Sequence, residues 1–388
     1  MKDGAGMKTL YLFFAVYFIY VGMTGMVPKF YGEIGLSDSQ IGGITTVITV
    51  VGLLLQPAWG TLADRAKYKK TVLTLGLAVA GVISFLVLPV SGNYGLLLLT
   101  LTAFNIFLLP AMPVSNAIGI EYTTAQRKNF GPIRMMGTVG YQAGILGVGL
   151  VLAESLRGLY QAIGIILLIS AALALLLPPV CGHQGSKGKK VPMSVLLRDR
   201  NIVLLLAVTF FAHIGHQFSL SFFTKHLGDL GMGNSLTGLI TMLSVSLEIP
   251  FLLVGDRLMR KLSIWRWQLC GLLIGTIRFA MLSFVRTPVM LVFAQTLSIV
   301  YLACFEFFPM LYLGKSVKEE LQVTGQSMLQ MISFGLARIV GAMAGGLIAD
   351  ARGIPFVFAL IAVMTLCTAA VFARPLLRRD RAERTLGR

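Results

Sequence analysis

Long apolar stretches separated by short polar breaks constrain this chain more than any other feature. Of its 388 residues, 56% are hydrophobic and only 13% are charged, whereas soluble chains carry about 25% charge. A membrane-spanning helix needs about 20 apolar residues, and barrel strands alternate in polarity, which these stretches do not. The sequence therefore predicts an all-α membrane protein with twelve transmembrane helices, near residues 9–28, 40–62, 71–90, 96–118, 133–154, 159–178, 201–224, 235–255, 266–285, 288–313, 324–348 and 354–373.

The distribution of basic residues predicts which side of the membrane each loop faces. If the N-terminus is cytoplasmic, 25 of the 33 Lys and Arg residues fall on the cytoplasmic side, five fall outside and three lie within the apolar stretches. Cytoplasmic loops are enriched in Lys and Arg. We therefore expect a multi-pass protein of the cell (inner) membrane with both termini in the cytoplasm, and the net charge of +17 does not indicate nucleic-acid binding.

A polar linker divides the chain into two halves. The longest break between apolar stretches is Gly-rich and basic and has no apolar periodicity, which is typical of a flexible connection. We predict an N-terminal six-helix bundle over residues 1–178, a cytoplasmic linker over 179–200, and a C-terminal six-helix bundle with a basic cytoplasmic tail over 201–388.

The two halves contain similar segments at corresponding positions. Residues 140–158 form a Gly-rich stretch that ends in Glu154 and an Arg-Gly pair, and residues 335–353 end in Asp350 and the same pair. A repeat in a membrane protein is typical of transporters, whose substrate site lies between the repeats. We therefore expect the two bundles to be pseudo-symmetric; chance similarity between Gly-rich helices is the alternative.

The loop after the second stretch carries a recognisable motif. It reads Gly60-Thr-Leu-Ala-Asp64-Arg65-Ala-Lys67-Tyr-Lys-Lys. This resembles the loop signature of the major facilitator superfamily, except that Lys67 stands where that family commonly has Gly. The resemblance implies the major facilitator fold and a gating role for Gly60, Asp64 and Arg65. We also expect Gly60 to permit a close approach between helices; an ordinary basic loop is the alternative.

The fifth stretch combines a polar face with a glycine face. Arg134, Thr138 and Tyr141 are spaced so that they share one face of a helix. The remaining face carries small residues that favour tight helix packing, namely Gly137, Gly140, Gly144 and Gly147. The Arg-Met-x-Gly-x-Val-Gly-aromatic run resembles the lactose permease branch, with the related phenylpropionate and nucleoside permeases. The resemblance implies that Arg134 contacts substrate and Tyr141 stacks on it; alternatively, Arg134 extends to the headgroups.

Two charged residues in the second half lie within apolar stretches. Glu248 and Arg278 each occupy the middle of such a stretch, where an unpaired charge costs roughly 3 kcal/mol. Both match charged positions of the same permease branch, which implies a substrate or proton site. A permanent salt bridge between helices is the alternative.

The seventh stretch carries His213, His216 and Gln217 and also resembles that branch, although lactose permease has acids where the two histidines fall. His213 and His216 share one helix face, and a histidine side chain can titrate near neutral pH, which suits a proton relay or a hydrogen-bonding site; a structural role for each is the alternative.

The tenth stretch departs from the lactose permease pattern. Ser298 and Tyr301 stand where that family has its His and Glu. Glu306 lies two turns further along, and it either takes over proton binding or pairs with Arg338. The proton-coupling candidates are therefore Glu248, Glu306, His213 and His216, and the predicted substrate site comprises Arg134, Thr138, Tyr141, His213, His216, Gln217, Glu248, Arg278, Ser298 and Tyr301.

The most consistent interpretation is a secondary active transporter that couples a proton gradient to symport of a small polar organic solute by alternating access. A sugar, a nucleoside or an aromatic acid would suit the site; a proton-driven exporter of drugs or lipids is the alternative. A membrane enzyme or receptor is disfavoured, because no hydrolase, metalloprotease or nucleotide-binding motif and no large soluble domain is present. We expect no cofactor, metal or disulfide, and a monomer whose partners are its solute, protons and the bilayer.

Overall fold

The computed structural model describes residues 3–181, 198–246, 262–316 and 319–385, and these residues fold into helices with no strands among them. In the first half of the chain the helices are α1 (Asp3–Met23), η1 (Thr24–Met26), α2 (Val27–Glu33), α3 (Asp38–Arg65), α4 (Lys69–Ser84), α5 (Tyr94–Leu108), α6 (Ala111–Ala125), α7 (Gly131–Val151), η2 (Leu156–Gly158) and α8 (Leu159–Leu175).

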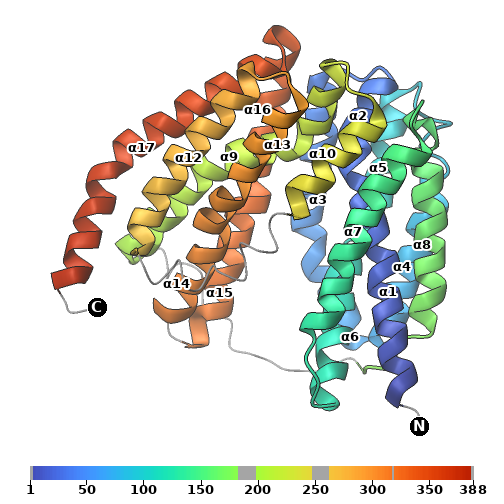
Figure 1. Ribbon diagram of the computed structural model, residues 1–388. Helices are drawn as coiled ribbons and strands as arrows, with labels where there is room; N and C mark the ends of the chain where they lie inside the picture. Colours follow the sequence, from blue (N-terminus) through green and yellow to red (C-terminus); the bar gives the residue numbers. More distant parts are fainter. Residues whose placement is uncertain (1–2, 182–197, 247–261, 317–318, 386–388) are drawn as a thin grey trace. The chain divides into compact units, whose positions relative to one another are not determined.

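In the second half the helices are α9 (Arg200–Asp229), α10 (Asn234–Ser246), α12 (Ile264–Phe284), α13 (Pro288–Leu302), η4 (Ala303–Phe307), α14 (Phe308–Ser316), α15 (Glu319–Gln330), η5 (Met331–Leu336), α16 (Ala337–Arg352) and α17 (Ile354–Thr385) (Figure 1). The short segments η4 and η5 are single π-helical turns inside longer helices. Such turns are rare and occur frequently at functional sites.

Nine helical stretches of the described residues are long and apolar enough to cross a membrane. Helices also occupy the other three predicted spans, as α4, α7 and α10, the last of which ends at Ser246, the last described residue before 262. Some predicted boundaries were wrong: α4 ends at Ser84 rather than near residue 90, and the first span continues past Pro28 to Glu33. Proline is tolerated at Pro28 because it lies at the start of α2, where its missing N–H costs nothing.

Two compact units make up the chain. Unit 1 comprises Met1–Leu36, Thr46–Gly188 and Leu227–Met242, and unit 2 comprises Ser37–Thr45, Lys189–His226 and Leu243–Arg388. Each unit therefore contains one short segment from the other half of the sequence. Most of the predicted linker, over residues 182–197, lies outside the described residues.

In unit 1, α1 packs along α7 through the predicted glycine face (Figure 1). A Cβ at Gly140 would overlap the carbonyl oxygen of Ala15, and one at Gly144 would overlap that of Ile19. The two backbones therefore lie in direct contact, which larger side chains would prevent. Gly147 differs, because a Cβ there would meet no atom within 4 Å.

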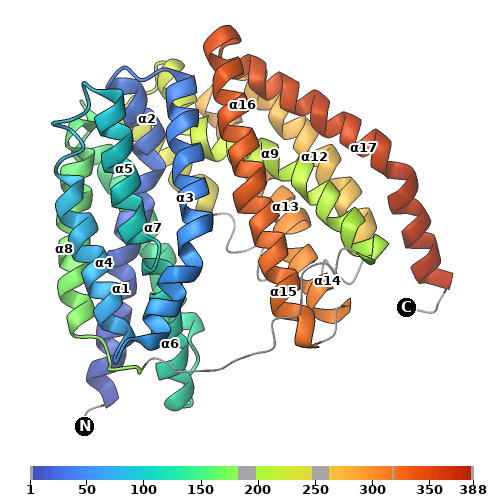
Figure 2. The same ribbon diagram turned by 180° about the vertical axis from the view of Figure 1, so that it is seen from behind.

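In unit 2, α12 packs along α17 (Figure 2) and also contacts α13. The core contains fully buried aromatic side chains, among them Phe218, Phe279, Tyr301 and Phe358. The rings of Phe279 and Tyr301 meet edge to face with their centroids 5.7 Å apart. Phe279 also lies against the guanidinium of Arg278.

Candidate functional site

Arg278 is the most enclosed cation of unit 2 among the described residues. It lies in the second half of α12 with 1% of its surface exposed. Its Nη2 donates to Ser219 Oγ at 2.9 Å and to Gln295 Oε1 at 2.8 Å, and its guanidinium lies 4.8 Å from the ring centroid of Phe279. Nε and Nη1 have no hydrogen-bond partner among the described residues. The site thus offers unused N–H donors in an apolar surrounding.

The polar side chains of α9 are also buried. The imidazoles of His213 and His216 have their centroids 6.1 Å apart, and His216 lies close enough to Arg278 to interact electrostatically. Gln217 Nε2 donates to the carbonyl oxygen of Ser333, on the π-turn η5, at 3.0 Å. Within the described residues four atoms of this group lack a hydrogen-bond partner: His213 Nε2, His216 Nδ1, Gln217 Oε1 and Ser333 Oγ.

The predicted α13 residues bond to protein groups in this structure. The hydroxyl of Tyr301 donates to the carbonyl oxygen of Ala212 on α9, and Ser298 Oγ donates to the carbonyl oxygen of Gln295 at 2.5 Å. A Cβ at Gly275 would overlap the Tyr301 ring. Tyr301 therefore connects α13 to α9 by a hydrogen bond and packs against α12, the helix that carries Arg278.

The predicted residues of α7 lie in unit 1. The guanidinium of Arg134 lies 4.5 Å from the ring centroid of Phe18 on α1, and the side chain is exposed at the end of its helix. Thr138 and Tyr141 are half-buried on the same face. This cation-π contact was not foreseen, since the sequence gives no indication that Phe18 lies beside Arg134.

Of the two predicted acids, Glu306 lies within the described residues. Glu248 lies outside the described residues, so its predicted pairing with Arg278 stays a prediction. Glu306 is half-buried on the π-turn η4, directly after the helix that carries Gln295. Arg338, its suggested partner, is exposed on α16.

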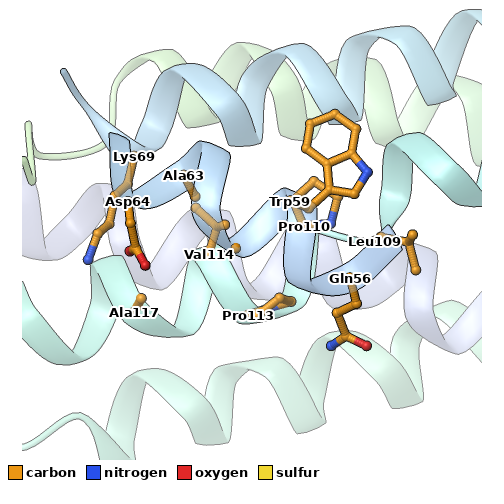
Figure 3. A pocket seen from close by; sticks show the side chains of 11 residues that line it. Gln56, Trp59, Ala63, Asp64, Lys69, Leu109, Pro110, Pro113, Val114 and Ala117 are labelled. Carbon is orange, nitrogen blue, oxygen red and sulfur yellow. The ribbon is translucent and has the colours of Figure 1, made fainter. Parts of the chain in front are cut away.

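The predicted gating loop borders a cavity in unit 1. The cavity has a volume of about 290 Å³ and lies between α3 and α6. In Figure 3 Asp64 and Lys69 lie toward one end of it, with Trp59 and Gln56 toward the other. Lys69 is buried and pairs with Glu121 of α6, so it does not face the headgroups as a loop lysine would. A Cβ at Gly60 would meet no atom within 4 Å, so the expected close approach at Gly60 is not present among the described residues.

The sequence did not predict the role of Lys29. Its ammonium group is buried and donates to the carbonyl oxygen of Met232 at 2.6 Å and to Thr237 Oγ1 at 3.1 Å. Nearby, Asn234 Nδ2 donates to the carbonyl oxygen of Leu152, at the end of α7, at 2.8 Å. These bonds hold the start of α10 within unit 1. A lysine at the end of an apolar stretch was the available signal, but its partners lie over 200 residues away in the sequence.

A second polar cluster in unit 2 involves Asp350. The similarity between residues 140–158 and 335–353 placed Asp350 at the position of Glu154 but predicted no interaction for it. Its two carboxylate oxygens accept from the backbone N–H of Asp38 at 2.6 Å and of Ser39 at 2.9 Å. Asp350 of α16 therefore caps the N-terminus of α3, where a negative charge is favoured. Asp38 itself pairs with Lys225 at 2.9 Å.

Known proteins resemble this chain in sequence and in fold. The sequence profile of the MFS_1 like family matches residues 7–360. The chain belongs to this family. It is therefore a multi-pass membrane transporter and not an enzyme, and the major facilitator fold predicted from the loop motif is confirmed.

Several proteins resemble this MFS_1 like protein over most of their length. It is 25% identical to a maltose permease of Geobacillus stearothermophilus (99% of this chain and 97% of the relative). It is 22% identical to a putative nucleoside transporter, YegT, of Escherichia coli strain K12 (88% and 84%). Among solved structures, the nucleoside transporter NupG superposes with a TM-score of 0.84 at 17% identity (94% and 98%), a likeness that shows the fold alone.

Proposed function

We propose that this protein is a proton-coupled symporter that takes up a small hydroxylated solute, a sugar or a nucleoside, by alternating access. The observation that carries the proposal is the cluster around Arg278. Six buried polar atoms on Arg278, His213, His216, Gln217 and Ser333 have unused hydrogen-bonding capacity within the described residues. A buried polar atom left without a hydrogen-bond partner costs about 1–3 kcal/mol. Binding of water or of a polar solute that forms hydrogen bonds with these atoms is therefore strongly favoured.

The mixture of donors and acceptors favours hydroxyl groups. The guanidinium of Arg278 can only donate, whereas Gln217 Oε1 can only accept. A sugar or ribose hydroxyl serves both, because it donates and accepts at one oxygen. The named relatives agree with this class, since one is a maltose permease and another a putative nucleoside transporter. An aromatic acid would use the same donors but would leave Gln217 Oε1 unpaired.

The proton step is assigned to a glutamate or a histidine rather than to Arg278. Glu306 is supported by its place on a π-turn between α13 and α14, and Glu248, His213 and His216 are the other candidates. Their roles, like those of Arg134, Thr138 and Tyr141, are part of this proposal, as are an inner-membrane location and cytoplasmic termini.

The test is transport by purified protein in proteoliposomes. An acidic exterior should drive accumulation of radiolabelled maltose or uridine, and an uncoupler should abolish it. R278A should abolish uptake and the thermal stabilisation by substrate while remaining monodisperse. R157A is the matched control, because Arg157 is exposed on η2, and it should transport normally. Uptake driven only by an acidic lumen would instead identify a proton antiporter, which is the exporter alternative.

A further inference from the structure

The exposed face of α17 changes from apolar to basic along its length. Residues three, four or seven apart share a face of a helix. The apolar part of the face comprises Leu360, Val363 and Val371, which are 43%, 57% and 69% exposed. The basic part follows directly and comprises Arg374, Arg378 and Arg381, which are also exposed.

The opposite face of the same segment is anchored to α12. Leu376 is fully buried and Asp380 is 1% exposed. The carboxylate of Asp380 accepts from Ser263 Oγ at 2.6 Å and from Arg266 Nε at 2.8 Å. Asp380, which lies between Arg378 and Arg381 in the sequence, is therefore bonded to α12, whereas Arg374, Arg378 and Arg381 are exposed on the other face.

The bonds of Asp380 also relate the arginines to the apolar stretch of α12. Ser263 caps α12, whose stretch long and apolar enough to cross a membrane begins at Ile264, so Asp380 lies level with that end of α12. Arg374 is six residues earlier on α17, about 9 Å toward the bilayer centre at the rise of an α-helix. A long arginine side chain from that depth reaches the headgroup layer while its stem stays among acyl chains.

Two charges of this face lack a counter-charge among the described side chains. Arg374 and Arg378 are four residues apart, where like charges repel each other, and neither forms an ion pair with a described residue. Guanidinium groups bind phosphate oxygens in a bidentate geometry. An anion bound to this face would remove the repulsion.

We propose that Arg374, Arg378 and Arg381 bind the phosphate of an anionic phospholipid whose acyl chains lie along Leu360, Val363 and Val371. A soluble anion would use only the arginines. A lipid uses the whole face, because the boundary between apolar and basic residues matches the boundary between its acyl chains and its headgroup. The site is independent of the transported solute.

The test compares protein released from nanodiscs that contain equal amounts of phosphatidylcholine and phosphatidylglycerol, with native mass spectrometry to identify the retained lipids. Wild type should retain phosphatidylglycerol preferentially. R374Q/R378Q/R381Q should lose this preference, at roughly fivefold in affinity for each arginine removed. R157Q, which removes an exposed arginine elsewhere, should behave as wild type, and R374K/R378K/R381K should keep most of the preference.

Three outcomes would overturn the proposal: no preference in wild type, an unchanged preference in the triple glutamine variant, or displacement of the lipid by inorganic phosphate at millimolar concentration. If the triple variant does not fold, the single variants R374Q and R378Q replace it, and each should weaken the preference about fivefold. The wild-type preference should also weaken in about 1 M salt, where screening acts over about 3 Å, and an undiminished preference would contradict an electrostatic site.

Discussion

At the scale of single residues, the protein buries polar groups that a packed core would exclude. Arg278 uses one of its three nitrogens for Ser219 and Gln295 and leaves two without a partner in the described chain. The sequence predicted that Arg278 is important, because a cation within an apolar stretch is costly. It could not predict the two partners, which lie on other helices.

The first residue-scale prediction concerns Arg278. In R278K a single ammonium replaces the planar guanidinium and cannot present the same fixed fork of donors. We expect the charge and the fold to persist but the affinity for substrate to fall by about 1–3 kcal/mol, or roughly fivefold to 150-fold. Substrate titration followed by thermal shift measures this, with R157K as the control. Wild-type affinity in R278K would remove Arg278 from the substrate site.

A second prediction separates proton coupling from substrate binding at Glu306. E306Q cannot release a proton but keeps the size and polarity of the side chain. We expect gradient-driven accumulation to be lost while exchange of external for internal substrate continues, because exchange needs no net proton movement. Both are measured in the same proteoliposomes, with E154Q as the control, since Glu154 is exposed. Normal accumulation by E306Q would assign the proton to another group.

At the scale of the elements, helix contacts depend on where small residues meet a neighbouring backbone. The sequence predicted a glycine face on α7 from its spacing, and the structure confirms the contacts at Gly140 and Gly144 but not at Gly147. The spacing alone treats these glycines alike. Which of them meets α1 depends on the crossing of two helices that are over a hundred residues apart in the chain.

This difference yields a paired prediction. In G140A the added methyl group overlaps the carbonyl oxygen of Ala15, whereas in G147A it enters open space. Because backbone cannot move aside as a flexible side chain can, G140A should lower the melting temperature of the purified protein by several degrees and G147A should leave it nearly unchanged. Equal melting temperatures for the two variants would show that α1 and α7 do not approach so closely.

At the scale of the whole molecule, the two halves of the sequence do not use their matching residues in the same way. Asp350 caps the N-terminus of α3 within unit 2. Its counterpart in the repeat, Glu154, is exposed, and in unit 1 the corresponding contact is made by Asn234 and Lys29 instead. The repeat in the sequence therefore predicts a similar position in the fold but not a similar interaction.

Because Asp350 caps a helix and Glu154 is exposed, the same type of substitution at the two positions should affect stability differently. D350N removes the negative charge at the start of α3 and replaces one of two accepting oxygens by a donor, which should cost about 1 kcal/mol. E154Q makes the same type of change at an exposed position and should cost almost nothing. Thermal unfolding in one detergent compares the two variants. A loss of stability in E154Q equal to that in D350N would contradict the assigned cap.

The sequence by itself determined that this chain is a helical membrane protein with the major facilitator fold. Whether an apolar stretch can span a membrane depends on the stretch alone, since the free energy of its transfer into lipid is set by its composition and length. The loop around Asp64 indicated the superfamily, because its motif is a contiguous run of residues that can be recognised without knowing the fold.

Only the tertiary structure decided which polar groups meet. Arg278 and Ser219 are 59 residues apart in the chain, and Asp350 and Asp38 are 312 apart. Lys69 and Gly60 belong to one loop motif, yet Lys69 is buried against Glu121 and Gly60 faces open space. Hydrogen bonds and ion pairs require two groups within a few ångströms of each other, and that distance is set by how helices pack rather than by the composition of either one.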